Sequence, residues 1–165
     1  MRDRTAKRQK RLKHIIFGKK PCGRDVGPRN MPLADRIHIE RRAMCKEGLL
    51  YKAINQDNGA VLANKLRVAQ TFKSRSQGLL NRNGLEQGEA LLIQPCTSIH
   101  TFFMKFPIDV AFLDRKGRVV KIAKNIRPWR LSGCLFGAHM VIEFNAGTLT
   151  NSLINVGNVV KIEAN

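Results

Sequence analysis

Two carboxylates embedded in apolar stretches are the side chains best suited to chemistry. Asp109 lies in the run IDVAFL (residues 108–113), and Glu143 lies in the run MVIEF (residues 140–144). A buried carboxylate must find hydrogen-bond donors or raise its pKa, because an unpaired buried charge is costly. Arg75 and His100 are the partners that the sequence offers. We therefore predict a polar pocket of Arg75, His100, Asp109 and Glu143 that binds a small ligand.

This pocket has alternatives that the sequence leaves open. The same residues could hold a metal or act as acid and base. They could equally form structural hydrogen bonds and ion pairs that fix strand register, which is the commoner role of such acids. We assign no catalytic residue and no metal site, and we expect no cofactor.

A second group of residues suggests nucleic acid. The segment Arg127-Pro128-Trp129-Arg130 combines two cations with the only tryptophan of the chain. An exposed aromatic ring can stack an unpaired base while the cations hold phosphates. The alternative is a loop in which Trp129 covers the core. Arg127, Trp129 and Arg130 are therefore the predicted contacts of a nucleic-acid-associated protein, which is our alternative function.

Several expected signatures of enzymes are missing. The four cysteines form no C-x-x-C pair, so neither a zinc knuckle nor a redox site is indicated. Cys96 and His100 are four residues apart, about 13 Å along an extended strand, so a thiol and base pair is disfavoured. The chain also lacks G-x-S-x-G, H-E-x-x-H, G-x-G-x-x-G and Walker-type motifs. These absences favour a protein that is not an enzyme.

Short strands and turns must position the candidate residues. Strict alternation in residues 108–113 puts Asp109 on the opposite face from Ile108 and Val110. Asn58-Gly59 and Lys116-Gly117 predict two hairpin turns. The expected strands cover residues 50–54, 60–62, 66–69, 90–94, 99–104, 108–113, 118–124, 139–144 and 159–162.

One or two short helices accompany these strands. Thr71 is expected to cap a helix that buries Phe72, Leu79 and Leu80, with Arg75 beside that face and Asn83-Gly84 as its stop. Thr148 is expected to cap a second helix with Leu149 and Leu153 on one face. The pattern predicts a mainly β domain, a small sandwich or barrel-like fold, over residues 49–165.

The basic N-terminal segment differs from the rest of the chain. The protein has 165 residues and a formal net charge of +18, and residues 1–51 carry fifteen Lys and Arg against five acids. Apolar residues before Glu47 show no sustained period. We expect residues 1–48 to be disordered, to be a nucleic-acid-binding arm, or to lie partly upstream of a translation start at Met44.

The cellular location is predicted from the absence of a membrane-spanning segment and of a signal peptide in the sequence. No apolar run approaches the roughly 20 residues that span a bilayer, and no signal-peptide pattern follows the basic start. We therefore expect a cytoplasmic protein that does not bind a membrane.

Four segments carry a family resemblance: LRVAQTFKSRSQGLL (66–80), ALLIQPCTSIHTFFMKFPIDVAFLDRKGRVVKI (90–122), VIEFNAGT (141–148) and VGNVVKI (156–162). In this order and spacing they closely resemble the bacterial and archaeal family called domain of unknown function 192, over about residues 50–165. The resemblance implies a small, mainly β domain with a short helix or two. It implies no activity.

The resemblance also maps the family's characteristic residues onto this chain. They fall on Arg75, Gly78, His100, Thr101, Met104, Pro107, Asp109, Glu143, Gly147 and Gly157. Many relatives have tryptophan and asparagine within the segment that here reads IHTFFMKF, so a role for His100 would belong to a subgroup. Relatives begin shortly before the first hairpin, which favours a start near Met44.

Overall fold

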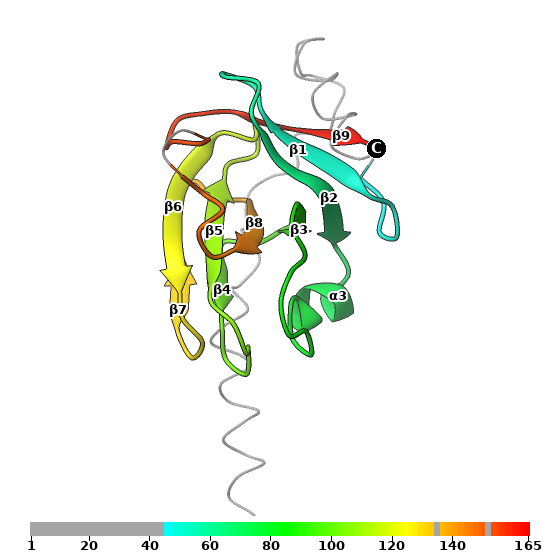
Figure 1. Cartoon of the computed structure of the whole chain (residues 1–165), viewed down its shortest axis with the longest axis vertical. Helices are drawn as coiled ribbons and strands as arrows, with labels where there is room; N and C mark the ends of the chain where they lie inside the picture. The colour runs from blue at the N-terminus through cyan, green and yellow to red at the C-terminus, as the bar shows by residue number, and fades with distance from the viewer. Residues whose placement is uncertain (1–44, 134–135, 151–152) are drawn as a thin grey trace, which may run out of the picture. The chain divides into compact units, whose positions relative to one another are not determined.

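The computed structural model describes residues 45–133, 136–150 and 153–165 (Figure 1). Our predictions for residues 1–44 lie outside this range. The elements are β1 (Tyr51–Asn55), β2 (Val61–Ala69), α3 (Phe72–Gln77), β3 (Glu89–Ile93), β4 (Ser98–His100), β5 (Ile108–Leu113), β6 (Val119–Ile126), β7 (Leu131–Gly133), β8 (Met140–Asn145) and β9 (Val160–Ala164).

Seven of these strands form one curled sheet in the order β6-β5-β8-β3-β2-β1-β9, and β4 and β7 form a separate pair. All neighbours in the large sheet are antiparallel except β2 and β3, which are parallel. The two edge strands approach each other at one end, where Arg118 bridges Val159 just before β6 and β9 begin. The sheet is therefore a half-barrel, and the mainly β prediction is confirmed.

The sheet has an apolar core on each face. The barrel core lies inside the curl and draws on nearly every strand; the largest of its fully buried members are Leu66, Leu92, Leu113, Val119, Ile142, Phe144, Leu149 and Ile154. The outer core lies on the other face of β3, β5 and β8; it comprises Leu79, Leu85, Leu91, Ile93, Ile99, Met104, Phe106, Ile108, Val110, Phe112 and Val141, with Ala69. Because both faces of β3, β5 and β8 are covered, these strands are buried along almost their whole length.

The predicted β5–β6 hairpin is present. Asp114 Oδ1 accepts hydrogen bonds from the backbone N–H groups of Lys116 (2.6 Å) and Arg118 (2.9 Å), and Gly117 has a φ of +80°. Glycine adopts this left-handed conformation without the steric cost of a side chain. The turn helps to fix the register of β5 against β6.

Helix α3 begins where it was predicted but ends early. Thr71 caps it by accepting a hydrogen bond from the Ser74 N–H (3.1 Å). The helix ends at Gly78, whose φ of +46° breaks the helical path, so Asn83-Gly84 is not its stop. The expected buried face is also wrong, because Phe72 is 67% exposed. Leu79 joins the outer core from the turn that follows.

Two other predicted elements differ from the structure. The strand expected over residues 99–104 stops at His100, because Phe103 takes a φ of +66° in a tight turn. A helix was also expected after Thr148, but residues 148–150 and 153–154 are not helical. Residues 151–152 lie outside the described range. Leu149 instead enters the barrel core.

Residues just before β1 contact the β domain. Cys45 packs partly buried against the barrel core, and the Lys46 N–H donates to the Tyr51 hydroxyl (2.6 Å). Glu47 Oε1 accepts hydrogen bonds from the Gln70 and Thr71 N–H groups and from the Ser74 hydroxyl. These bonds lower the pKa of Glu47 to about 2. An anionic Glu47 thus fastens this segment to the start of α3.

In the described part of the chain no helix combines the length and apolarity required to cross a bilayer.

Candidate functional site

Glu143 is a buried acid at the centre of the sheet. It lies on β8, opposite Leu91 of β3 and Val110 of β5, both members of the outer core. Its Oε2 atom has no hydrogen-bond partner, and burial raises its pKa to about 8. At neutral pH Glu143 is therefore protonated and able to donate a hydrogen bond.

Cys96 lies within electrostatic reach of both Arg75 and Glu143. The pKa of the Cys96 thiol is raised to about 11, chiefly by burial; ionisation of Glu143 acts in the same direction, and the positive charge of Arg75 opposes it. The thiol donates to the Ser98 carbonyl (3.1 Å), and an Arg75 Nη1–H donates to the Pro95 carbonyl (2.7 Å). Helix α3 and residues 95–98 are thus joined beside β8. A neutral thiol with this raised pKa is a poor nucleophile.

His100 lies at the end of β4, where its ring stacks on Phe102 at 5.5 Å. Burial lowers the pKa of His100, so the ring is neutral at neutral pH. Its buried Nδ1 atom has no hydrogen-bond partner. In the described structure His100 makes no hydrogen bond with Arg75 or Glu143.

Asp109 faces the other side of the sheet. It pairs with Phe144, a barrel-core residue, whereas Glu143 pairs with Val110 of the outer core. Asp109 Oδ1 accepts from the Asn125 N–H (2.8 Å) and Oδ2 from the Leu149 N–H (2.9 Å). Asn125 lies at a bulge in β6, with a φ of +53°. Asp109 therefore holds the bulge and the turn after β8, and it lies on the opposite face of the sheet from Glu143.

Buried polar atoms without partners concentrate in the predicted pocket residues. Within residues 45–133, 136–150 and 153–165 there are four: Arg75 Nε, Ser76 Oγ, His100 Nδ1 and Glu143 Oε2. Each such atom costs about 1–3 kcal/mol when nothing satisfies it. Sequence reasoning missed Ser76, which follows Arg75 in α3, and it treated Cys96 only as a partner for His100.

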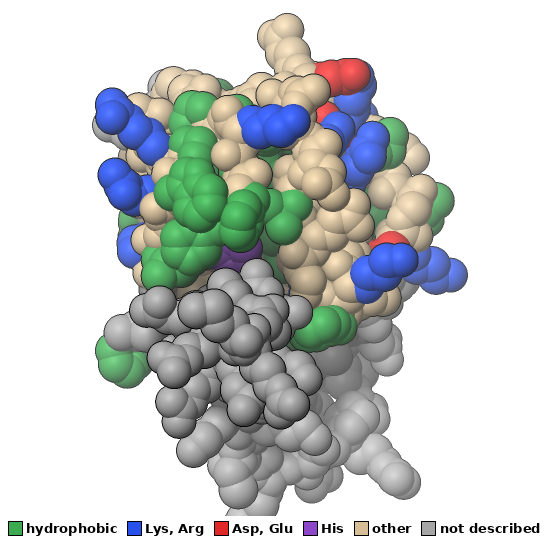
Figure 2. Space-filling view, turned by 90° about the horizontal axis from the view of Figure 1, so that it is seen from below, with side chains coloured by type: hydrophobic (Ala, Val, Ile, Leu, Met, Phe, Trp, Pro, Cys, Tyr) green, Lys and Arg blue, Asp and Glu red, His purple; other side chains and the backbone are tan. Residues whose placement is uncertain are grey.

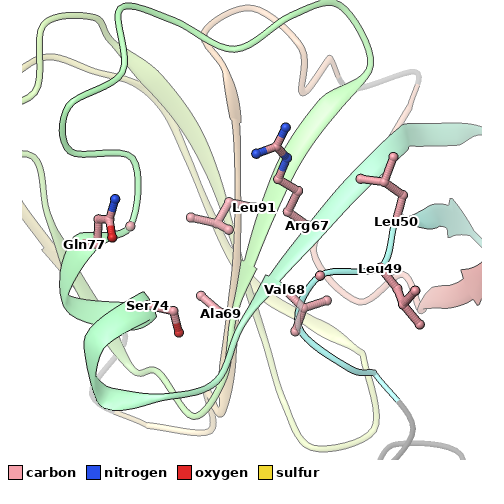
Figure 3. A pocket seen from close by; sticks show the side chains of 10 residues that line it. Leu49, Leu50, Arg67, Val68, Ala69, Ser74, Gln77 and Leu91 are labelled. Atoms are coloured by element: carbon pink, nitrogen blue, oxygen red, sulfur yellow. The ribbon is translucent and has the colours of Figure 1, made fainter.

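A hollow of about 440 Å³ lies beside α3 (Figure 3). Ser74 and Gln77 of α3 form one side, Leu49 and Leu50 the other, and Leu91 lies between them. Leu91 is also the strand neighbour of Glu143. Arg67 lines the same hollow and pairs with Glu89 at 3.3 Å. None of the four predicted pocket residues lines this hollow.

The predicted nucleic-acid contacts lie in the loop between β6 and β7. Arg127 and Arg130 are exposed, and in the described structure neither forms an ion pair. Trp129 is 56% exposed and belongs to neither core, so it does not cover the core as the alternative interpretation required. Figure 2 shows hydrophobic side chains gathered on the surface at this end of the domain.

In the described residues no cluster of histidine, cysteine and acidic side chains could hold a metal ion. The fold and site thus define a half-barrel domain with a buried, neutral glutamic acid. The chain belongs to the family called domain of unknown function 192, described as uncharacterized, whose model matches residues 53–162.

Similar proteins occur in the archaeal genera Thermococcus and Pyrococcus. A "UPF0127 protein" of Thermococcus sibiricus is 32% identical over 67% of this chain and 73% of its own length. The protein called UPF0127 protein PYRAB11210, from Pyrococcus abyssi, is 34% identical over 66% of this chain and 94% of its own. Neither name states an activity.

Two solved structures share the fold. One is a protein of unknown function from Novosphingobium aromaticivorans, with a TM-score of 0.60 and 20% identity, covering 88% of this chain and 99% of the other. The second, from Sinorhizobium meliloti, is described as a proposed transcription regulator. It also has a TM-score of 0.60 and 20% identity, and the match covers 68% of this chain and 92% of the other. At this identity the likeness concerns the fold alone.

Proposed function

We propose that this protein is a non-catalytic binding domain for a small molecule, and that Arg75, His100 and Glu143 contact the ligand. The observation that carries the proposal is the buried Oε2 atom of Glu143, which has no hydrogen-bond partner and belongs to a carboxyl group with a pKa of about 8. Asp109, whose two oxygens both accept backbone hydrogen bonds, is left out of the contacts.

The chemistry of the unpaired atoms selects a class of ligand. Arg75 Nε is a donor, and protonated Glu143 and the Ser76 hydroxyl can each donate as well. A molecule that accepts hydrogen bonds from these donors would carry acceptor oxygens, as a small carboxylate or a carbonyl compound does. Ionisation of Glu143 above about pH 8 would replace a donor with a negative charge. Binding of such a ligand should therefore weaken as the pH rises through 8.

The test is a thermal-shift screen of the full chain against small carboxylates and carbonyl compounds. We expect a compound that raises the melting temperature of the wild type at pH 7 and less so at pH 9. Arg75→Lys, which removes the Nε donor, should reduce the shift, and Arg115→Lys, at the exposed β5–β6 turn, is the matched control. Glu143→Gln should remove the pH dependence. A screen in which no compound stabilises the wild type, or in which Arg75→Lys responds as the wild type does, contradicts the proposal.

The exposed Arg127, Trp129 and Arg130 favour a second candidate, association with nucleic acid. The basic residues before Met44 would add non-specific attraction to phosphates, because neutralising phosphates releases counterions. Binding should therefore weaken steeply with salt, and a chain beginning at Met44 should show a shallower salt dependence than the full chain. Absent or salt-insensitive binding would exclude this candidate.

A further inference from the structure

Two loops at one end of the domain hold a cluster of three aromatic rings, of which two are exposed and one is half-buried. The loop after β4 carries Phe102 and Phe103, and the loop between β6 and β7 carries Trp129 (Figure 1). The Phe103 and Trp129 rings meet edge to face with centroids 4.7 Å apart, and Phe102 lies 5.9 Å from Trp129. Phe103 is 68% exposed, and Trp129 is more than half exposed. These three rings are called the aromatic platform below.

Thr101 holds the two loops together from beneath. Its hydroxyl donates to the Arg127 carbonyl (2.7 Å) and accepts from the Arg130 N–H (2.9 Å). Its backbone N–H donates to the Arg130 carbonyl, and its carbonyl accepts from the Trp129 N–H, both at 2.9 Å. Thr101 is completely buried. The platform is therefore preformed and does not depend on the exposed rings finding each other.

Both loop tips adopt an unfavourable backbone conformation. Phe103 has a φ of +66° and Trp129 a φ of +65°, a region that bulky side chains rarely occupy. Glycine or asparagine would fit these turns with less strain. Burial does not explain the aromatic residues, since both rings point substantially into solvent. Strain of this kind that is retained at an exposed position is characteristic of binding surfaces.

The charge around the platform is of one sign. Residues 98–107 and 124–133 contain Lys105, Lys124, Arg127 and Arg130 and no acidic residue. Arg127 and Arg130 flank Trp129 in sequence and, in the described structure, form no ion pair. The exposed carboxylate of Asp114 lies at the far turn of the β5–β6 hairpin. The platform thus complements a negatively charged partner that also presents flat, apolar faces.

We propose that the aromatic platform stacks an unpaired base of a single-stranded nucleic acid, with Arg127 and Arg130 contacting the flanking phosphates. This inference rests on the second candidate function and names its substrate class and its site. Aromatic rings accept any base that has left a duplex stack, whereas bases within a duplex present only their edges. The platform therefore binds single-stranded nucleic acid in preference to duplexes and shows little preference for base sequence.

Because Trp129 is the only tryptophan, its fluorescence reports directly on the platform. The experiment titrates the full chain with an oligothymidylate of about 12 nucleotides, within the usual site size. We expect quenching of the Trp129 emission, and weaker quenching by a duplex of equal length. In anisotropy titrations with a labelled oligothymidylate, Trp129→Ala should weaken binding by roughly tenfold to a hundredfold. Trp129→Phe should restore most of the affinity.

Two matched controls separate the platform from general charge and hydrophobicity. Phe72→Ala removes an equally exposed aromatic ring at the start of α3 and should bind as the wild type does. Arg127→Ala should weaken binding more than Arg115→Ala, which removes the same charge at the far turn of the β5–β6 hairpin.

The outcomes distinguish failure of the platform from failure of nucleic-acid association. Binding by anisotropy without quenching of Trp129, and unchanged in Trp129→Ala, would overturn the platform while leaving association through other basic residues. No binding by either method would overturn both. A change in Trp129 emission with anionic lipid vesicles but not with the oligothymidylate would assign the platform to a membrane surface and overturn the proposal.

Discussion

Replacing Glu143 by glutamine should change how stability depends on pH. Burial raises the pKa of Glu143 from 4.5 to about 8 in the folded protein. Between these values the unfolded chain has lost the proton and the folded chain keeps it, so folding binds a proton and stability falls as the pH rises. At about 1.4 kcal/mol per pH unit, the complete difference is on the order of 5 kcal/mol. Glutamine removes this titration and keeps the shape of the side chain.

The assay is urea unfolding followed by far-ultraviolet circular dichroism, for wild type and Glu143→Gln, from pH 5 to pH 8. We expect the free energy of unfolding of the wild type to fall relative to the variant by about 3–4 kcal/mol over this range. That is a large part of the 5–15 kcal/mol typical of a whole domain, about a fifth or more. The contributions of the other titratable groups cancel when the free energies of unfolding of wild type and variant are compared. The lowered pKa of His100 produces the opposite trend, because it makes stability fall as the pH falls. This contribution is the same in wild type and variant.

A difference between wild type and variant that stays constant from pH 5 to pH 8 would refute this reasoning. It would mean that Glu143 is ionised in the folded protein and paired, with Arg75, which like Glu143 acts on Cys96, as a candidate partner. The proposed donor to a ligand oxygen would then not exist at neutral pH, and the proposed function would lose its main support.

Three further perturbations test other parts of the structure. Glu47→Gln should lower the melting temperature at neutral pH; since the pKa of Glu47 is lowered to about 2, its contribution is present above pH 4.5 and lost as the pH falls toward 2, where variant and wild type should melt alike. Asp109→Ala should destabilise the domain by about 2–5 kcal/mol in urea unfolding, because two N–H groups lose their acceptor, whereas Asp109→Asn should cost less. Thr101→Val should release the β6–β7 loop without unfolding the domain, seen as a lower anisotropy of the Trp129 emission; unchanged anisotropy would contradict the bracing role of Thr101.

The strands were largely predictable because their signals are local. Alternation and the turn residues placed β5 and its hairpin with β6 correctly, since Asp114 and Gly117 make their turn from bonds within the turn itself. The cap of α3 at Thr71 is equally local. The end of α3 was not predictable from apolar spacing, because the backbone conformation of Gly78 ends the helix before Leu79.

The arrangement of the site depends on contacts between distant segments. Alternation shows that Asp109 and Val110 face opposite sides, but only the register of β5 against β8 decides which of them shares a face with Glu143. That register is fixed by bulges and turns far away in the chain. The left-handed backbone of Phe103 and Trp129 is likewise hidden from the sequence, because it is imposed by bonds to Thr101 from two separate loops.

The pairing of β9 with β1 has a consequence for how the chain acquires its fold. Tyr51 pairs with Ala164 and Asn55 with Val160, so the first strand of the domain receives its neighbour from the last. Contacts this distant along the sequence require closure of a very long loop, which slows folding. During synthesis, one edge of β1 presents unpaired N–H and C=O groups until β9 leaves the ribosome. A growing chain is therefore exposed to edge-to-edge association with other chains until β9 has paired with β1.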